Sequence, residues 1–173
     1  MQNIKKESYL IIGGPNSKKS EVSLMLSKTL KYKLINLDRE KYSYFNDFTD
    51  FDSGYYYNLI ETKGDLVALS YIHKYEMKHL NYVLDNIDTN SVIDFSSNYL
   101  IIDDVIILDK IKDFNNIVFL KKNNINTNNI LENKLYRNKI LNEIKTLEIN
   151  IDNKTVEDIV KEILDNKKYK EIL

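Results

Sequence analysis

The sequence contains no cysteine, a single proline and four glycines in 173 residues. The absence of cysteine excludes disulfides, thiolate metal sites and cysteine nucleophiles. Arginine is almost as scarce, because only Arg39 and Arg137 are arginines among 25 basic residues. Few guanidinium groups are therefore present to bind carboxylate or phosphate oxygens in pairs. With so little proline and glycine no linker is evident, which predicts one domain over residues 1–173.

Long apolar runs and an excess of charge of one sign are also missing. No stretch approaches the roughly 18 apolar residues of a membrane-spanning helix, and residues 1–8 are polar, unlike a signal peptide. The 25 basic and 26 acidic residues give a net charge of −1, which provides no long-range attraction to nucleic acid or to an anionic membrane. We therefore expect a cytoplasmic protein, a monomer or weak homodimer, with neither nucleic acid nor membrane as a partner.

The residues that are present favour an α/β protein. Hydrophobic residues make up 43% of the chain, enough for a buried core at this length. Short apolar runs alternate with amphipathic stretches, which predicts a three-layer α/β/α fold with a five-stranded parallel sheet. The predicted strands are 9–12, 33–37, 91–95, 116–120 and 146–151, and the predicted helices are 18–30, 65–86, 103–114, 128–145 and 153–164.

The strongest local signal lies between the first predicted strand and the first predicted helix. It reads Gly13-Gly-Pro-Asn-Ser-Lys-Lys-Ser20 and nearly meets the pattern G-x-x-x-x-G-K-[ST] of phosphate-binding loops. In such loops backbone N–H groups bind the anion, the lysine reaches the outer phosphates and the hydroxyl holds Mg²⁺. The predicted nucleotide-binding residues are Gly13, Gly14, Asn16, Ser17, Lys18, Lys19 and Ser20, and Ser20 is also the predicted metal ligand.

Lys18 is the departure from this pattern, because it stands where the second glycine is expected. Its side chain restricts how the backbone can turn. Asn16, in contrast, tolerates a left-handed conformation better than most residues. The alternative interpretation is a tight strand-to-helix turn that binds nothing.

Beyond the loop, the chain resembles the shikimate kinases. Residues 31–40 (Lys-Tyr-Lys-Leu-Ile-Asn-Leu-Asp-Arg-Glu) are similar to the segment that carries two aspartates on that family's second strand. Residues 91–98 lie where the family has a strand and a glycine triplet, residues 133–136 resemble its "RPLY" segment, and residues 155–164 resemble its closing helix. The loop is also similar to that of adenylate kinase relatives. The resemblance implies a P-loop kinase fold and transfer of a phosphoryl group from ATP, with Mg²⁺, to a hydroxyl of shikimate or a related small molecule.

The resemblance also implies roles for individual residues. Lys19 and Asp38 would be catalytic, with Asp38 binding the acceptor hydroxyls and positioning the nucleophilic oxygen. Asp38 could instead be an exposed helix cap. The predicted acceptor site is completed by His73, near the position of a substrate-binding arginine, by Ser97 in the triplet, and by Arg137, one helical turn from the "RPLY" arginine.

Several family residues are replaced here. Asn36 stands in place of an aspartate linked to Mg²⁺, Asn133 in place of the "RPLY" arginine, and residues 121–132 contain no arginine where the family has its lid. Positioning and electrostatics drive phosphoryl transfer. These losses therefore leave two alternatives open, a non-catalytic homologue that binds a nucleotide or acts in regulation, and an α/β domain that binds no phosphate.

Two further features each have two interpretations. Asp94 ends an apolar run, so it could organise Mg²⁺ opposite the phosphate loop or make a local turn. Residues 55–57 are three consecutive tyrosines, which could line an acceptor pocket or pack against neighbouring helices.

Overall fold

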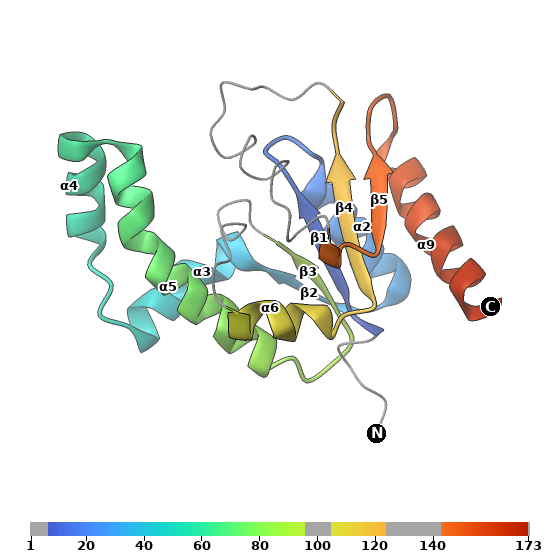
Figure 1. Ribbon diagram of the computed structural model, residues 1–173, viewed down its shortest axis with the longest axis horizontal. Helices are drawn as coiled ribbons and strands as arrows, with labels where there is room; N and C mark the ends of the chain where they lie inside the picture. The colour runs from blue at the N-terminus through green and yellow to red at the C-terminus, as the bar shows by residue number, and fades with distance from the viewer. Residues whose placement is uncertain (1–6, 96–104, 124–142, 173) are drawn as a thin grey trace.

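The computed structural model describes residues 7–95, 105–123 and 143–172, with side chains up to residue 166. Its centre is a five-stranded sheet in the order β2-β3-β1-β4-β5, and every adjacent pair of strands is parallel. The strands are β1 (Tyr9–Gly13), β2 (Lys33–Asn36), β3 (Ser91–Asp94), β4 (Asn116–Lys121) and β5 (Leu147–Asn150). This arrangement, drawn in Figure 1, confirms the predicted parallel α/β sheet.

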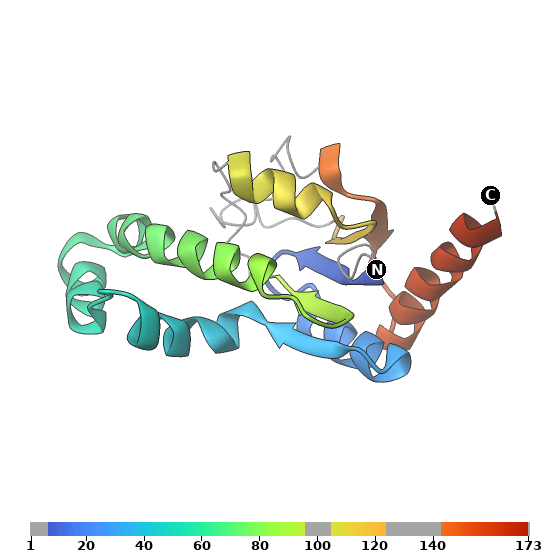
Figure 2. The same cartoon turned by 90° about the horizontal axis from the view of Figure 1, so that it is seen from below.

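The two faces of the sheet are covered by different helices. Along β1, Leu10 and Ile12 belong to one buried cluster and Tyr9 and Ile11 to the other, because successive side chains of a strand point to opposite faces. The first cluster includes residues of α5 (Asp65–Asp85) and α6 (Val105–Lys112), and the second includes residues of α2 (Lys19–Leu30) and α9 (Val156–Ile172). The two pairs of helices lie on opposite sides of the sheet in Figure 2.

The start of α9 is set by a side-chain cap in the sequence. Thr155 caps α9, because its hydroxyl accepts from the N–H of Asp158 at 3.1 Å while its own N–H donates to the Asp158 carboxylate at 3.0 Å. The helix predicted at 153–164 therefore begins later, at Val156, and continues to Ile172. The helix predicted at 128–145 falls almost entirely outside the described residues.

Two helices between β2 and α5 were not predicted. They are α3 (Leu37–Phe48), which follows β2 directly, and α4 (Ser53–Lys63). Asn36 ends the strand by capping α3, since its side-chain oxygen accepts from the N–H of Arg39 at 2.8 Å. The strand predicted to reach Leu37 is therefore one residue too long. Asp52 caps α4 in the same way.

The helices α3, α4 and α5 extend beyond the sheet. Figures 1 and 2 both place α4 and the start of α5 at the end of the molecule farthest from β5. Aromatic side chains bind these helices together, with Phe45 of α3 packed 5.9 Å from Tyr75 of α5, between ring centroids. No helix within the described part of the chain is both long and apolar enough to cross a membrane.

Candidate active site

The predicted phosphate loop follows β1 and leads into α2, at the carboxyl end of the central strand. Gly13 packs directly against Ser17, so that a Cβ atom at position 13 would lie 2.4 Å from the Ser17 Oγ. Ser17 is buried, and its hydroxyl has no hydrogen-bond partner in the described structure. Only glycine allows the loop to fold back this closely.

The backbone of the loop turns through two left-handed residues. Asn16 has a φ of 56° and Lys18 a φ of 58°. Lys18 thus adopts the conformation for which the sequence pattern uses glycine, despite the cost of its Cβ atom. Its ammonium group points away to the carbonyl oxygen of Lys154, at 2.6 Å, while Lys122 donates to the carbonyl oxygen of Pro15 at 2.7 Å.

These contacts leave a hollow over the loop. It has a volume of about 440 Å³ and is lined by the consecutive residues Gly14, Pro15, Asn16, Ser17, Lys18, Lys19, Ser20 and Glu21. The hollow also lies at the start of α2, where N–H groups of the first turn have no partners within the helix.

Lys19, which lines this hollow, forms an ion pair with Asp94 at the end of β3. The Lys19 Nζ lies 3.4 Å from the Asp94 Oδ1, and the two side chains are 10% and 4% exposed. The other carboxylate oxygen of Asp94 accepts from the side-chain amide of Asn36 at 2.6 Å. Asn36 and Asp94 are direct partners in the β2–β3 register. Asp94 thus contacts the loop lysine, and its role in organising Mg²⁺ stays a prediction.

A second charged group lies beyond the end of β2. Asp38, in the first turn of α3, is paired with Lys41 on the same helix, whose Nζ lies 3.3 Å from the Asp38 Oδ1 and 3.2 Å from the Glu76 Oε1 of α5. Lys41 and Glu76 are buried, whereas the Asp38 side chain is 52% exposed. Asp38 therefore presents one carboxylate oxygen to Lys41 and has room for an external partner.

Burial and neighbouring charges both shift the pKa values of Lys41 and Glu76. Burial alone would lower the pKa of Lys41, but the carboxylates of Glu76 and Asp38 raise it above its ordinary value, which keeps the ammonium charged. Burial raises the pKa of Glu76, and the nearby Lys41 opposes that shift. The sequence analysis missed both residues. Their only signals were a lysine one turn after Asp38 and a glutamate within the apolar stripe of α5.

The other predicted acceptor residues are only partly described. His73 is half-buried on α5, one turn before Glu76, and its charge acts to lower the Glu76 pKa. The structure therefore brings His73 near the Asp38–Lys41–Glu76 group. Ser97 and Arg137 lie outside the described residues, as do Asn133 and most of the segment compared with the family's lid.

The three consecutive tyrosines lie on α4 and have different surroundings. The ring of Tyr55 is 5.0 Å from that of Tyr71, and the ring of Tyr56 is 6.0 Å from that of Phe51, so these two pack within the helical extension. Tyr57 is 57% exposed. Packing thus accounts for the first two and leaves Tyr57 facing solvent.

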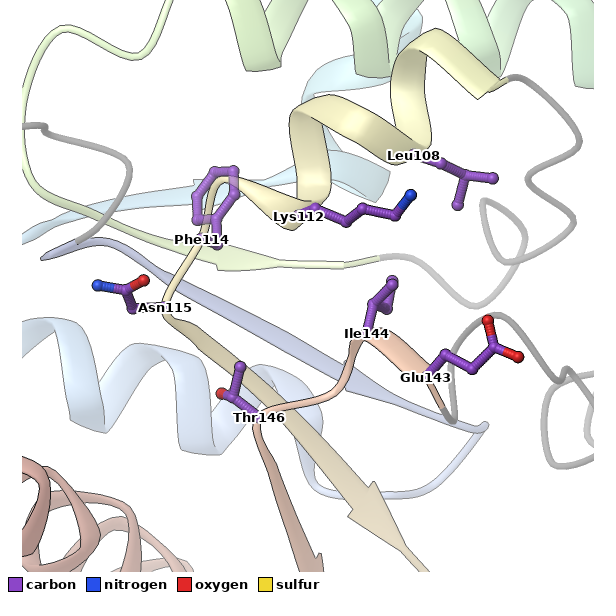
Figure 3. Close-up of a pocket in the computed structure, with 7 residues that line it drawn as sticks. All are labelled: Leu108, Lys112, Phe114, Asn115, Glu143, Ile144 and Thr146. Carbon is purple, nitrogen blue, oxygen red and sulfur yellow. The ribbon is translucent and has the colours of Figure 1, made fainter.

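A second hollow lies at the opposite end of the sheet from the phosphate loop. It measures about 680 Å³ and is lined by residues of α6 and of the segments before β4 and β5, shown in Figure 3: Leu108, Lys112, Phe114, Asn115, Glu143, Ile144 and Thr146. None of the predicted site residues lines it. Ligands of open parallel sheets bind at the carboxyl ends of the strands, which favours the phosphate-loop end as the functional site.

The sheet order and the loop between β1 and α2 define the P-loop kinase fold. Similar structures include a shikimate kinase from Aquifex aeolicus, with a TM-score of 0.60 and 19% identity over 95% of this chain and 97% of that chain. A shikimate kinase from Acinetobacter baumannii, in complex with shikimate, gives a TM-score of 0.62 and 14% identity over 98% of both chains.

A third similar structure is the YorR protein from Bacillus subtilis, in complex with phosphorylated GDP. It has a TM-score of 0.55 and 18% identity over 95% of this chain and 98% of that chain. No protein-family model matches the sequence, and no curated protein matches it at the level of sequence. At these identities the similarity establishes the fold that the sequence predicted, and the function is argued from the site.

Proposed function

We propose that this protein is a kinase that transfers a phosphoryl group from ATP to a hydroxyl of a small molecule. The observation that carries the proposal is the Lys19–Asp94 ion pair beneath the left-handed Gly13–Ser20 loop. A lysine beside an open phosphate-loop hollow is suited to the outer phosphates. A buried carboxylate opposite that lysine is the kind of group that helps to hold Mg²⁺ in P-loop enzymes.

The residues present fit Mg²⁺ bound together with a nucleotide. Magnesium uses one or two protein oxygens, the substrate phosphates and waters, and Ser20 and Asp94 provide a hydroxyl and a carboxylate. No cluster of three acidic or histidine side chains suited to a metal occurs in the described part of the chain, so a metal cage made by the protein alone is not part of the proposal. When bound, Mg²⁺ would neutralise phosphate charge.

The remaining roles follow from the positions of Lys19 and Asp38. Lys19 exchanges its contact with Asp94 for the phosphate oxygens and stabilises the charge that develops there. The acceptor hydroxyl donates its proton to the exposed carboxylate of Asp38, and its oxygen attacks the terminal phosphorus as the bond from phosphorus to the bridging oxygen breaks. ADP leaves with that bridging oxygen, and the phosphorylated acceptor is the second product.

A non-catalytic nucleotide-binding module is the second candidate. It is favoured by Lys18, whose ammonium already donates a hydrogen bond to the carbonyl oxygen of Lys154. Arg39 likewise lines a separate groove between α3 and α5, with Tyr44 and His79. Neither Lys18 nor Arg39 is therefore placed to stabilise charge during transfer. The two candidate functions both predict nucleotide binding, and only the kinase predicts turnover.

Thermal unfolding with and without Mg²⁺·ATP tests the binding step. A ligand that binds only the folded state raises the melting temperature by mass action, so we expect a shift in the wild type and its loss in Lys19→Ala. Lys28→Ala, an exposed lysine in the last turn of the same helix, is the matched control and should keep the shift. Absence of a shift in the wild type at millimolar ATP would refute both candidates.

Release of ADP in the presence of hydroxyl compounds, with shikimate among them, tests the transfer step. We expect an acceptor-dependent rate that Asp38→Asn lowers by about 10²–10⁴-fold, the usual contribution of a general base. Asp38→Asn should keep the ATP shift, because Asp38 lies outside the phosphate loop. A retained shift without turnover for any hydroxyl compound would favour the non-catalytic module.

A further inference from the structure

The charges of the Asp38–Lys41–Glu76 group do not balance. One ammonium faces two carboxylates, at 3.3 Å and 3.2 Å, which leaves an excess of one negative charge. Lys41 and Glu76 have side chains that are only 7% and 2% exposed. The positive charge of Lys41 is thus already used by the protein, and the exposed part of the group is the carboxylate of Asp38.

Tyrosine side chains surround this group. Tyr42, which follows Lys41 on α3, has a pKa raised by burial, and Lys41, Tyr57, Glu76 and Asp38 all act on it electrostatically. Burial likewise raises the pKa of Tyr56, whose charged neighbours include Lys41 and Glu76. The phenols are therefore neutral at physiological pH. The side chains of Tyr42 and Tyr57 are 40% and 57% exposed, so both are open to a ligand.

We propose that the acceptor is a hydroxyl compound that carries no negative charge, such as a polyol or an amino alcohol, and that it binds at Asp38 between these tyrosines. The inference rests on the proposed kinase function and specifies its acceptor. A carboxylate oxygen and neutral phenols accept from and donate to hydroxyl groups, and their combination also suits an ammonium group. Among the described residues of this group the cation is Lys41, and it is already paired with two carboxylates.

An anionic acceptor would have to compete for Lys41. If it displaced Glu76 from Lys41, a carboxylate would remain buried without its partner, which is strongly unfavourable. Other cations on α5 do not change this balance. Lys74 lies 4.5 Å and Lys78 5.7 Å from the centre of the Tyr75 ring, and Lys74 is exposed, so solvent screens its charge. His73 is the other titratable neighbour of Glu76 on this helix.

Shikimate and its methyl ester are matched probes, because they share the ring and hydroxyl groups and differ in the negative charge. Binding of each to the wild-type protein, saturated with Mg²⁺·ADP, is measured by calorimetry. We expect the uncharged methyl ester to bind at least about tenfold more tightly than shikimate. Equal affinities, tighter binding of shikimate, or binding of neither probe at its solubility limit would each overturn the inference.

A variant that frees Lys41 tests the cause of the preference. Glu76→Gln removes one carboxylate, so the affinity for shikimate should rise by at least about tenfold relative to the ester. Asp109→Asn removes an exposed acid of α6 that is paired with Lys112, and it should leave the preference unchanged. An unchanged preference in Glu76→Gln would overturn the inference, provided that its ATP shift and melting temperature show a folded protein.

The nucleotide shift separates this inference from the function on which it rests. If the wild type shows the Mg²⁺·ATP shift but prefers the anionic probe, the acceptor class is wrong and the kinase proposal stands. If the shift itself is absent, the kinase proposal fails first.

Discussion

Asn36 donates its side-chain amide to Asp94 across the β2–β3 register, with 2.6 Å between nitrogen and oxygen. Asn36 stands where the shikimate kinase pattern has an aspartate linked to Mg²⁺. In the structure the carboxylate lies on the neighbouring strand, in contact with Lys19, and the amide supplies the proton that holds it there. An aspartate at position 36 could not donate this hydrogen bond while ionised.

Asn36→Asp should therefore destabilise the protein at neutral pH. Two carboxylates would replace a donor–acceptor pair, at a cost of about 1–3 kcal/mol, and one of them would take up a proton with a raised pKa. The free energy of unfolding, measured in urea, should recover as the pH falls from 7.5 to 5 or as Mg²⁺ is added.

Asn115→Asp, at an exposed position before β4, is the control for adding a carboxylate and should show neither recovery. Equal stability of Asn36→Asp and the wild type at both pH values would mean that the hydrogen bond from Asn36 to Asp94 does not stabilise the protein.

Gly13→Ala should close the phosphate loop. The new Cβ atom would lie 2.4 Å from the Ser17 Oγ and 3.2 Å from the Leu120 Cβ, and overpacking of this kind costs about 1–3 kcal/mol. We expect a lower melting temperature and loss of the ATP shift. Adding Ser17→Gly removes the closest contact and should restore part of the stability.

Gly54→Ala on α4 provides the comparison, since its nearest neighbour is a side-chain oxygen of Asp52 at 3.3 Å. It should keep both the melting temperature and the ATP shift. A normal shift in Gly13→Ala would show that the loop can accept the extra atom and does not need glycine there.

The sequence predicted the central strands of the sheet well because β1, β3 and most of β4 are buried on both faces. The run Tyr9–Gly13 is buried throughout, and such continuous apolar runs are typical of central parallel strands. The sequence-based prediction failed for α3 and α4. In these helices tyrosine, asparagine and aspartate replace a regular apolar stripe, and each helix begins at a side-chain cap. Tyr44 of α3 and Tyr55 of α4 pack on α5, and that contact could not be read from local periodicity.

The candidate site was accessible from the sequence only in part, for a related reason. Lys19 and Ser20 follow a local motif, and Asp94 ends a strand, so local sequence was sufficient to select them as candidates, and their roles stay predictions. Lys41 and Glu76 are 35 residues apart and meet only when α3 packs on α5. The left-handed conformation was foreseen for Asn16 but not for Lys18, because lysine has no intrinsic preference for it.

The backbone conformation of Lys18 predicts an unusual order of stability among its variants. At a φ of 58°, Gly avoids the Cβ cost of about 1 kcal/mol that Ala must bear. Lys18→Gly should therefore be more stable than Lys18→Ala by about this amount in chemical denaturation. At Ser70, an exposed helical position on α5, the order should reverse, with Ala more stable than Gly by about 1 kcal/mol. The same order at both positions would contradict a left-handed loop.

His79 should make the stability depend on pH. It is buried on α5, with its ring centre 5.0 Å from that of Tyr44 on α3. Burial lowers its pKa to about 4, and the nearby Lys41 adds to the shift. Because an unfolded histidine has a pKa of about 6.5, the unfolded state binds the proton first as the pH falls. Stability should therefore decrease between about pH 6.5 and pH 4, by on the order of 2 kcal/mol.

The difference between variants isolates this contribution from that of the carboxylates. In His79→Phe the ring is kept and the proton site is lost, so the urea midpoint should fall less between pH 6.5 and pH 4 than in the wild type, whatever the absolute stability of the variant. If His79→Phe and the wild type lose stability in parallel over this range, His79 takes up its proton at the same pH in the folded and unfolded states, and its burial between α3 and α5 does not lower its pKa.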